Sequence, residues 1–96
     1  MIEVAHNPEA SRYEIRVDGV LAGFADYRTR PGARMVFTHT EISEEFGGRG
    51  LGSRLIREAL DSARAAGATV TPLCEFVAEY IRRHPEYQDL VEIPGA

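Results

Sequence analysis

The stretch EEFGGRGLGSRLIREAL, residues 44–60, places four glycines within six positions and then continues as an amphipathic pattern. Glycine loses more conformational freedom on folding than other residues, so this density indicates that the bare backbone is used at the junction. After the glycines the apolar side chains recur at helical spacing, at Leu51, Leu55, Ile56, Ala59, Leu60 and Ala63. The pattern predicts a helix over residues 51–66, and Gly67 is placed to end it.

The residues before this junction alternate between apolar and polar side chains, which is typical of β-strands. Tyr13, Ile15 and Val17 fall on one face of such a strand, with charged residues between them. Asp18-Gly19 and Pro31-Gly32 predict tight turns between successive strands. We therefore expect an antiparallel meander of three strands, within residues 12–17, 20–29 and 34–42.

The residues after the helix predict one more strand and one more helix. Residues 68–73 are short and β-branched, and Pro72 restricts them to a sheet edge or a strand end. A helix is expected over residues 74–83, with a buried stripe formed by Phe76, Val77, Tyr80 and Ile81. Pro85 prevents its continuation, and the tail from residue 86 is expected to add one short strand or helical turn. The fold class is then α+β: a mixed sheet in which an antiparallel meander precedes a β-α-β crossover and a C-terminal helix.

Length and charge limit the classes of function. A chain of 96 residues suffices for one domain, which we expect to span residues 1–96. The formal net charge of −4 argues against nucleic acid as a partner, because phosphate binding normally requires a basic surface. The chain contains no lysine, so neither a P-loop lysine nor a Schiff base is available.

Cysteine, histidine and hydropathy content point to a cytoplasmic protein without a metal. Cys74 is the only cysteine, which rules out an intrachain disulfide. No apolar run reaches the ~18 residues of a membrane span, and the N-terminus does not read as a signal peptide. His6, His39 and His84 are scattered, so no metal site is expected. We expect a monomer or a weak homodimer.

The glycine junction has the layout of an anion site: a strand, a glycine loop and the start of a helix. The first N–H groups of a helix have no intrahelical acceptor and lie at its positive end. Glycine leaves them open to a diphosphate, and Arg49 and Arg54 add positive charge. A plain glycine-rich turn is the alternative. The dinucleotide fingerprint fails because its third glycine would fall on Ser53. The G-x-x-G of KH modules fits residues 47–50, but KH loops lie between helices of basic domains.

Three motifs resemble a small single-domain branch of the GNAT superfamily of N-acetyltransferases: HTEI (39–42), GRGLGSRL (48–55) and TPLCEFVAEYIRRHPEY (71–87). The superfamily loop that grips coenzyme A reads Gln/Arg-x-x-Gly-x-Gly/Ala. Gly50 and Gly52 match its last two positions, whereas Gly47 stands where Gln or Arg is expected. The resemblance covers about residues 10–90. It implies a GNAT-like fold truncated at the N-terminus, without the two N-terminal helices of typical members.

The resemblance also implies a ligand and its site. Acetyl-CoA is expected to bind against the main chain of one strand and the loop after it, at Thr40, Glu41, Ile42, Gly47, Gly48, Arg49, Gly50, Leu51, Gly52 and Ser53. The acetyl group would pass to an amine, either of a small molecule or of a protein or peptide. A non-catalytic acyl-CoA-binding or protein-interaction module is the alternative.

Cys74 is a candidate nucleophile, and in this branch the matching cysteine is the proposed catalytic residue. A thiol at the start of the second helix lies at the positive end of its dipole, which favours the nucleophilic thiolate. A buried cysteine without chemistry is the alternative. In direct transfer, His39 or Glu41 would act as base and Tyr80 would protonate the departing thiolate. His39 alternates with Phe37, so it could also be an inward histidine, and the spacing of Tyr80 also fits a core residue.

Overall fold

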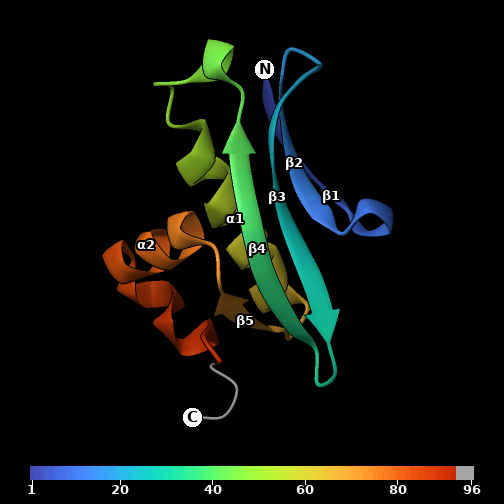
Figure 1. Ribbon diagram of the computed structural model, residues 1–96, viewed down its shortest axis with the longest axis vertical. Helices are drawn as coiled ribbons and strands as arrows, with labels where there is room; N and C mark the ends of the chain where they lie inside the picture. Colours follow the sequence, from blue (N-terminus) through green and yellow to red (C-terminus); the bar gives the residue numbers. More distant parts are fainter. Residues whose placement is uncertain (93–96) are drawn as a thin grey trace.

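The computed structural model describes residues 1–92. Five strands, two α-helices and three 3₁₀ helices follow one another along this part of the chain (Figure 1). They are β1 (Ile2–Asn7), η1 (Pro8–Ala10), β2 (Arg12–Val17), β3 (Val20–Arg30), β4 (Arg34–Ile42), η2 (Glu44–Phe46), α1 (Leu51–Ala65), β5 (Thr69–Pro72), α2 (Glu75–Arg83) and η3 (Pro85–Leu90).

The strands form a single mixed sheet in the order β1-β2-β3-β4-β5. The first four pair antiparallel, and β5 pairs parallel to β4. The predicted meander and β-α-β crossover are confirmed, and Pro72 is the last residue of the edge strand β5. The strands and helices share one hydrophobic core cluster, which gives the predicted α+β architecture.

The expectation of only three strands before the first helix is wrong, because β1 precedes them. Ile2 and Val4 lie on the same face as Ile15 and Val17 of β2, and they pack against the core. In β1 only Ile2 and Val4 keep the apolar alternation, because His6 takes the next position on that face, so the pattern alone does not distinguish this strand. Its pairing with β2, a tertiary contact, completes it.

The helix α1 covers one face of the sheet (Figure 1). Its predicted apolar stripe is fully buried, with Leu55, Ile56 and Leu60 at 0 % exposure. Burying a side chain of this size stabilises the fold by about 2 kcal/mol. The opposite face of β3 and β4 carries no helix, so this face of the sheet is open to solvent.

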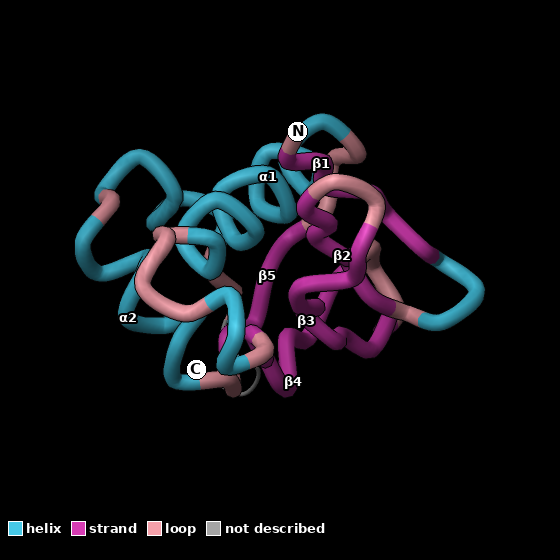
Figure 2. Tube along the Cα trace, turned by 90° about the horizontal axis from the view of Figure 1, so that it is seen from above, coloured by secondary structure: helices cyan, strands magenta, loops and turns pink. Residues whose placement is uncertain are grey.

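The helix α2 and η3 lie beside β5 and α1 (Figure 2). Tyr87 of η3 donates a hydrogen bond to Asp61 at 2.6 Å, and Arg64 pairs with Asp89 at 2.8 Å. The chain then forms an isolated parallel bridge between Val91 and Val70. The expected docking of the tail is therefore confirmed as far as residue 92, and the rest of the tail lies outside the described residues.

Candidate active site

The loop before α1 leaves a continuous run of backbone N–H groups open. Within residues 1–92, the N–H groups from Gly48 to Ser53 donate to no protein acceptor. Gly48 and Gly50 adopt φ of +77° and +72°, which favours glycine, and a Cβ at either would meet nothing within 4 Å. The predicted cluster of free amides at the mouth of a helix is therefore present and uncovered at these two positions.

The two arginines of this region differ in their contacts. The Arg49 guanidinium lies 5.6 Å from the ring centroid of Phe46 and forms no ion pair with any residue from 1 to 92. Arg54 pairs with Glu58 on α1, at 2.7 Å. Of these two arginines, Arg49 is therefore the one without a carboxylate partner among the described residues.

Phe76 of α2 packs against the first turn of α1. A Cβ on Gly52 would lie only 2.6 Å from Cζ of Phe76, so this glycine makes room for the ring. Phe76 is 43 % exposed, and its predicted place in the buried stripe is wrong, whereas Val77, Tyr80 and Ile81 are buried as expected. The ring forms a wall beside the loop amides, a role that helical periodicity does not reveal.

The strands β4 and β5 separate beyond Phe37. Their pairing ends at Phe37 and Pro72, where the carbonyl oxygen of Phe37 accepts from the N–H groups of Leu73 and Cys74, at 3.0 and 2.9 Å. The chain then turns into α2, while β4 continues to Ile42. Among the described residues, Thr38–Ile42 therefore has no strand partner on its β5 side. The predicted ligand-binding residues of β4 lie on this open edge.

Cys74 and Thr40 face each other across this split. The Cys74 thiol donates to the hydroxyl of Thr40, with Sγ 3.4 Å from Oγ1, although the residues are 34 positions apart. Cys74 is half-buried and occupies the N-cap position of α2, so the thiol lies at the positive end of that helix. The sequence suggested only main-chain contacts for Thr40, and its hydroxyl is a member of the site that sequence reasoning missed.

A β-bulge decides which β4 side chains face this split. Tyr27 pairs with Phe37 and Asp26 with His39, so Thr38 is an extra residue that shifts the alternation by one. The alternative of an inward His39 on the face of Phe37 is therefore wrong. The His39 side chain is 57 % exposed on the open face, where its Nε2 lies 3.2 Å from Oε1 of Glu41. Glu41 is exposed as well.

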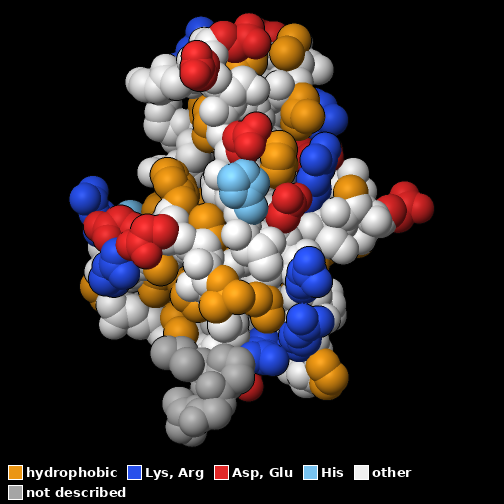
Figure 3. Space-filling view, in the orientation of Figure 1, with side chains coloured by type: hydrophobic (Ala, Val, Ile, Leu, Met, Phe, Trp, Pro, Cys, Tyr) orange, Lys and Arg blue, Asp and Glu red, His pale blue; other side chains and the backbone are white. Residues whose placement is uncertain are grey.

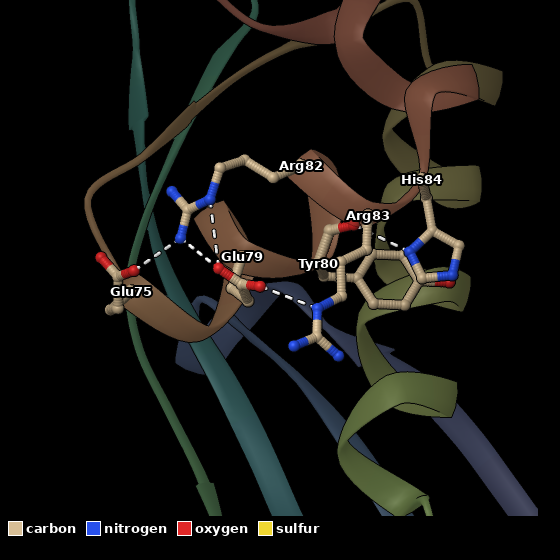
Figure 4. Close-up of polar contacts among 6 residues, drawn as sticks. All are labelled: Glu75, Glu79, Tyr80, Arg82, Arg83 and His84. Carbon is tan, nitrogen blue, oxygen red and sulfur yellow. Dashed lines mark hydrogen bonds and ion pairs between the residues drawn. The ribbon is translucent and has the colours of Figure 1, made fainter.

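Tyr80 lines a hollow of about 170 Å³ between the first turn of α1 and α2. Its ring stacks on His84 with centroids 3.9 Å apart, and His84 Nδ1 donates to the Tyr80 carbonyl oxygen at 2.8 Å (Figure 4). Burial raises the pKa of Tyr80 above 10, so the hydroxyl stays protonated at neutral pH. The remaining lining residues are Ser53, Phe76, Glu79, Arg83 and His84.

The structure brings together only some of the predicted residues. Thr40 and Cys74 form one pair, and the loop amides and Phe76 lie at the adjacent end of α1. No hydrogen bond within residues 1–92 joins Cys74 to His39 or to Tyr80. The same residues contain no group of three or more metal-ligating side chains, and none of their helices has the length and apolarity needed to cross a bilayer.

Comparisons with known proteins identify the family and the fold. Residues 12–90 match the model of a family described as GCN5-related N-acetyl-transferase. A GCN5-like protein from Staphylococcus aureus, solved by NMR, has a TM-score of 0.71 at 22% identity, and the match covers 94% of this chain and 87% of that one. No curated protein sequence matches.

Two larger proteins contain a similar fold. N-acetylglutamate synthase from Neisseria gonorrhoeae, complexed with coenzyme A and N-acetyl-glutamate, has a TM-score of 0.62 at 19% identity, covering 92% of this chain and 26% of that one. Ard1 from Thermoplasma volcanium has a TM-score of 0.60 at 22% identity, covering 81% and 54%. The fold, its split sheet and the family match over most of the chain lead to one conclusion: this chain belongs to the GCN5-related N-acetyltransferase family.

Proposed function

We propose that this protein is an acetyl-CoA-dependent N-acetyltransferase that transfers an acetyl group to an amine, with Cys74 as the residue that carries the acetyl group. One observation supports this proposal above the others. The Cys74 thiol lies at the split between β4 and β5, opposite Thr40, and the open amides of residues 48–53 follow at the end of the same strand.

The pyrophosphate of acetyl-CoA would accept hydrogen bonds from the amides of Gly48 to Ser53. Arg49 would add a charge-assisted contact, and the positive end of α1 favours the anion. The pantetheine arm of acetyl-CoA would then follow the unpartnered edge of Thr38–Ile42 towards Cys74.

The covalent route has two steps. The Cys74 thiolate attacks the thioester carbonyl carbon, the bond from that carbon to the sulfur of coenzyme A breaks, and the departing thiolate takes up a proton. The acceptor amine then attacks the acetyl-cysteine thioester, which forms the amide and returns Cys74 to the thiol. Thr40, at 3.4 Å from Sγ, holds the thiol at the split.

Direct transfer is the second candidate, and the open face of β4 favours it. There His39 and Glu41 lie 3.2 Å apart and could accept the proton of an amine that attacks the thioester without an enzyme intermediate. Tyr80, whose pKa burial raises, would supply the proton to the departing thiolate. A free catalytic thiol also suits a reducing compartment, so we propose a cytoplasmic location.

Intact-mass analysis tests the function and separates the routes. The wild-type chain incubated with acetyl-CoA should gain the mass of one acetyl group, and Cys74→Ala should not. Consumption of acetyl-CoA in the presence of a pool of amines should fall at least a hundredfold in Cys74→Ala. Full turnover by this variant would eliminate the covalent route and leave direct transfer. Binding of acetyl-CoA without adduct or turnover in the wild type would instead identify an acyl-CoA-binding module.

A further inference from the structure

The open face of β3 and β4 carries charges of opposite sign at its two ends. Cross-strand pairs define this face: Phe24 with Glu41, Asp26 with His39, Arg28 with Val36 and Arg30 with Arg34. Figure 3 shows the face directly, with a histidine and acidic side chains over the half of β4 nearer its arrowhead, basic side chains beside them over β2, and further basic side chains near the β3–β4 turn. No helix covers these strands on this side.

The basic end consists of Arg28, Arg30 and Arg34. Arg30 lies directly opposite Arg34, and like charges in this position destabilise a sheet. No ion pair within residues 1–92 involves any of the three, whereas six of the other arginines are paired with carboxylates. Arg28 and Arg30 are exposed, and Arg34 is half-exposed. A bound anion would relieve the repulsion among them.

The acidic end lies at the mouth of the split. Asp26 faces His39 across the strands, and Glu41 follows on the same face of β4, next to the segment that carries Thr40 opposite Cys74. Arg12 of β2 lies opposite Asp26 on the other side, but its guanidinium pairs with Glu14 at 2.8 Å. Asp26 and Arg30 lie four positions apart along β3, which corresponds to about 13 Å of extended strand. A protonated amine would be attracted to the acidic end while an anion occupies the basic end.

Charge of both signs on one face favours a particular kind of partner. A nucleic acid that contacted the three arginines and continued along the strands would meet Asp26 and Glu41, and the chain as a whole carries a net charge of −4. Resting on the function proposed above, we propose that the acceptor is a protein or peptide whose reactive amine is accompanied, about 13 Å away, by carboxylates that bind Arg28, Arg30 and Arg34.

Peptide binding tests this docking surface without relying on turnover. Fluorescein-labelled peptides carry one lysine with three glutamates beginning four residues away, on either its N- or its C-terminal side, and matched peptides carry glutamines instead. Binding to the full chain in the presence of coenzyme A is followed by anisotropy. At least one glutamate peptide should bind about tenfold more tightly than its glutamine match, and about 0.5 M salt should remove the difference.

Two variants with the same net charge provide the control. Arg30→Glu places a carboxylate opposite Arg34, so it should fold at least as well as the wild type, yet it should lose the preference for glutamate. Arg57→Glu, on the exposed side of α1, should keep that preference. A peptide with lysines in place of the glutamates should bind Arg30→Glu better than the wild type.

Each other outcome overturns the inference. Equal binding of glutamate and glutamine peptides, or equal losses in Arg30→Glu and Arg57→Glu, would show that the arginines do not receive carboxylates. Tight binding of a single-stranded RNA oligonucleotide that Arg30→Glu abolishes would make the cluster a phosphate site instead. The melting temperature with coenzyme A is measured in parallel. If coenzyme A raises the melting temperature but glutamate and glutamine peptides bind equally, only the docking surface is contradicted. If the glutamate peptide binds more tightly but coenzyme A leaves the melting temperature unchanged, only the proposed function is contradicted.

Discussion

At the scale of single residues, two glycines beside the site lie close to different kinds of neighbour. A Cβ on Gly23 would lie 2.4 Å from the carbonyl oxygen of Glu41, which belongs to the backbone of β4. A Cβ on Gly52 would meet the tip of the Phe76 ring, a side chain that is 43 % exposed and free to turn. The first clash therefore displaces a strand, and the second displaces only a ring.

Gly23→Ala should for this reason destabilise the protein by about 2 kcal/mol, because overpacking against a strand has no flexible side chain to absorb it. Urea unfolding followed by circular dichroism measures the change. Gly52→Ala should change stability by less than about 1 kcal/mol, since its clash is offset by the better helix propensity of alanine. Equal losses in the two variants would contradict this reading.

Glu14 is the residue whose ionisation is most strongly tied to folding. Its carboxylate is buried on the open side of the sheet between Arg12 and Arg16, at 2.8 and 2.9 Å. The hydrogen bond from Arg12, followed by that from Arg16, lowers the pKa of Glu14 from 4.5 to about 2. A lowered pKa means that the stabilisation is complete above pH 4.5 and is lost as the pH falls towards 2.

Glu14→Gln should consequently be less stable than the wild type by up to about 3 kcal/mol at pH 7. The difference between the two proteins should shrink as the pH falls from about 4.5 towards 2, because the unfolded wild-type chain takes up a proton on Glu14 in this range while the folded protein keeps the carboxylate ionised. Urea unfolding across this range measures it. Glu58→Gln, which removes a carboxylate from a more exposed pair with Arg54, should stay within about 0.5 kcal/mol of the wild type. A pH-independent effect at Glu14 would refute the argument.

At the scale of elements, the strength of the local pattern decided what the sequence could predict. The helix α1 was predictable because its apolar stripe, its glycines and Gly67 agree, and the β2–β3 and β3–β4 turns were predictable from Asp18-Gly19 and Pro31-Gly32. The short strand β1 was missed because only its pairing with β2 completes it. An element can therefore be predicted when its own residues carry the pattern, and is missed when a contact with another element completes it.

The candidate site was predictable only in part from the sequence. The free amides were predictable because they follow from a glycine loop in front of a helix. The orientation of His39 was not, since the bulge at Thr38 depends on the register with β3 and leaves no local signature. Phe76 likewise has the spacing of a core residue, and only the approach of α1 shows why it stays at the surface. The position of a side chain that depends on contacts between two elements cannot be predicted from the sequence of either element alone.

Gly50 links the geometry of an element to ligand binding. Its φ of +72° costs an alanine about 1 kcal/mol, so Gly50→Ala should lower the melting temperature by about 4–8 °C. Gly50→Asn should recover part of this loss, because asparagine tolerates this conformation. Both variants should bind coenzyme A at least tenfold more weakly in calorimetry, since any side chain at this position hinders access to the amides. If Gly50→Asn is stable and binds coenzyme A as tightly as the wild type, the loop amides do not bind this ligand.

At the scale of the whole molecule, function depends on how the sheet is completed. The strands β4 and β5 pair over four residues and then separate, so one split connects the open amides, Thr40 and Cys74. Because α1 and α2 leave one face of β3 and β4 uncovered, His39 and Glu41 lie exposed on this face, beside the segment that carries Thr40. In the proposed function, coenzyme A and an acceptor would approach from different sides without a movement of the fold.

The central claim is that the amides of residues 48–53 bind the diphosphate of coenzyme A. The most direct test is a ¹H–¹⁵N NMR titration with coenzyme A and, separately, with pantetheine, which lacks the diphosphate. The account predicts that the amides of Gly48, Arg49, Gly50, Leu51, Gly52 and Ser53 shift most strongly with coenzyme A and stay in place with pantetheine. Unmoved loop amides at millimolar coenzyme A, or equal shifts with both compounds, would contradict it.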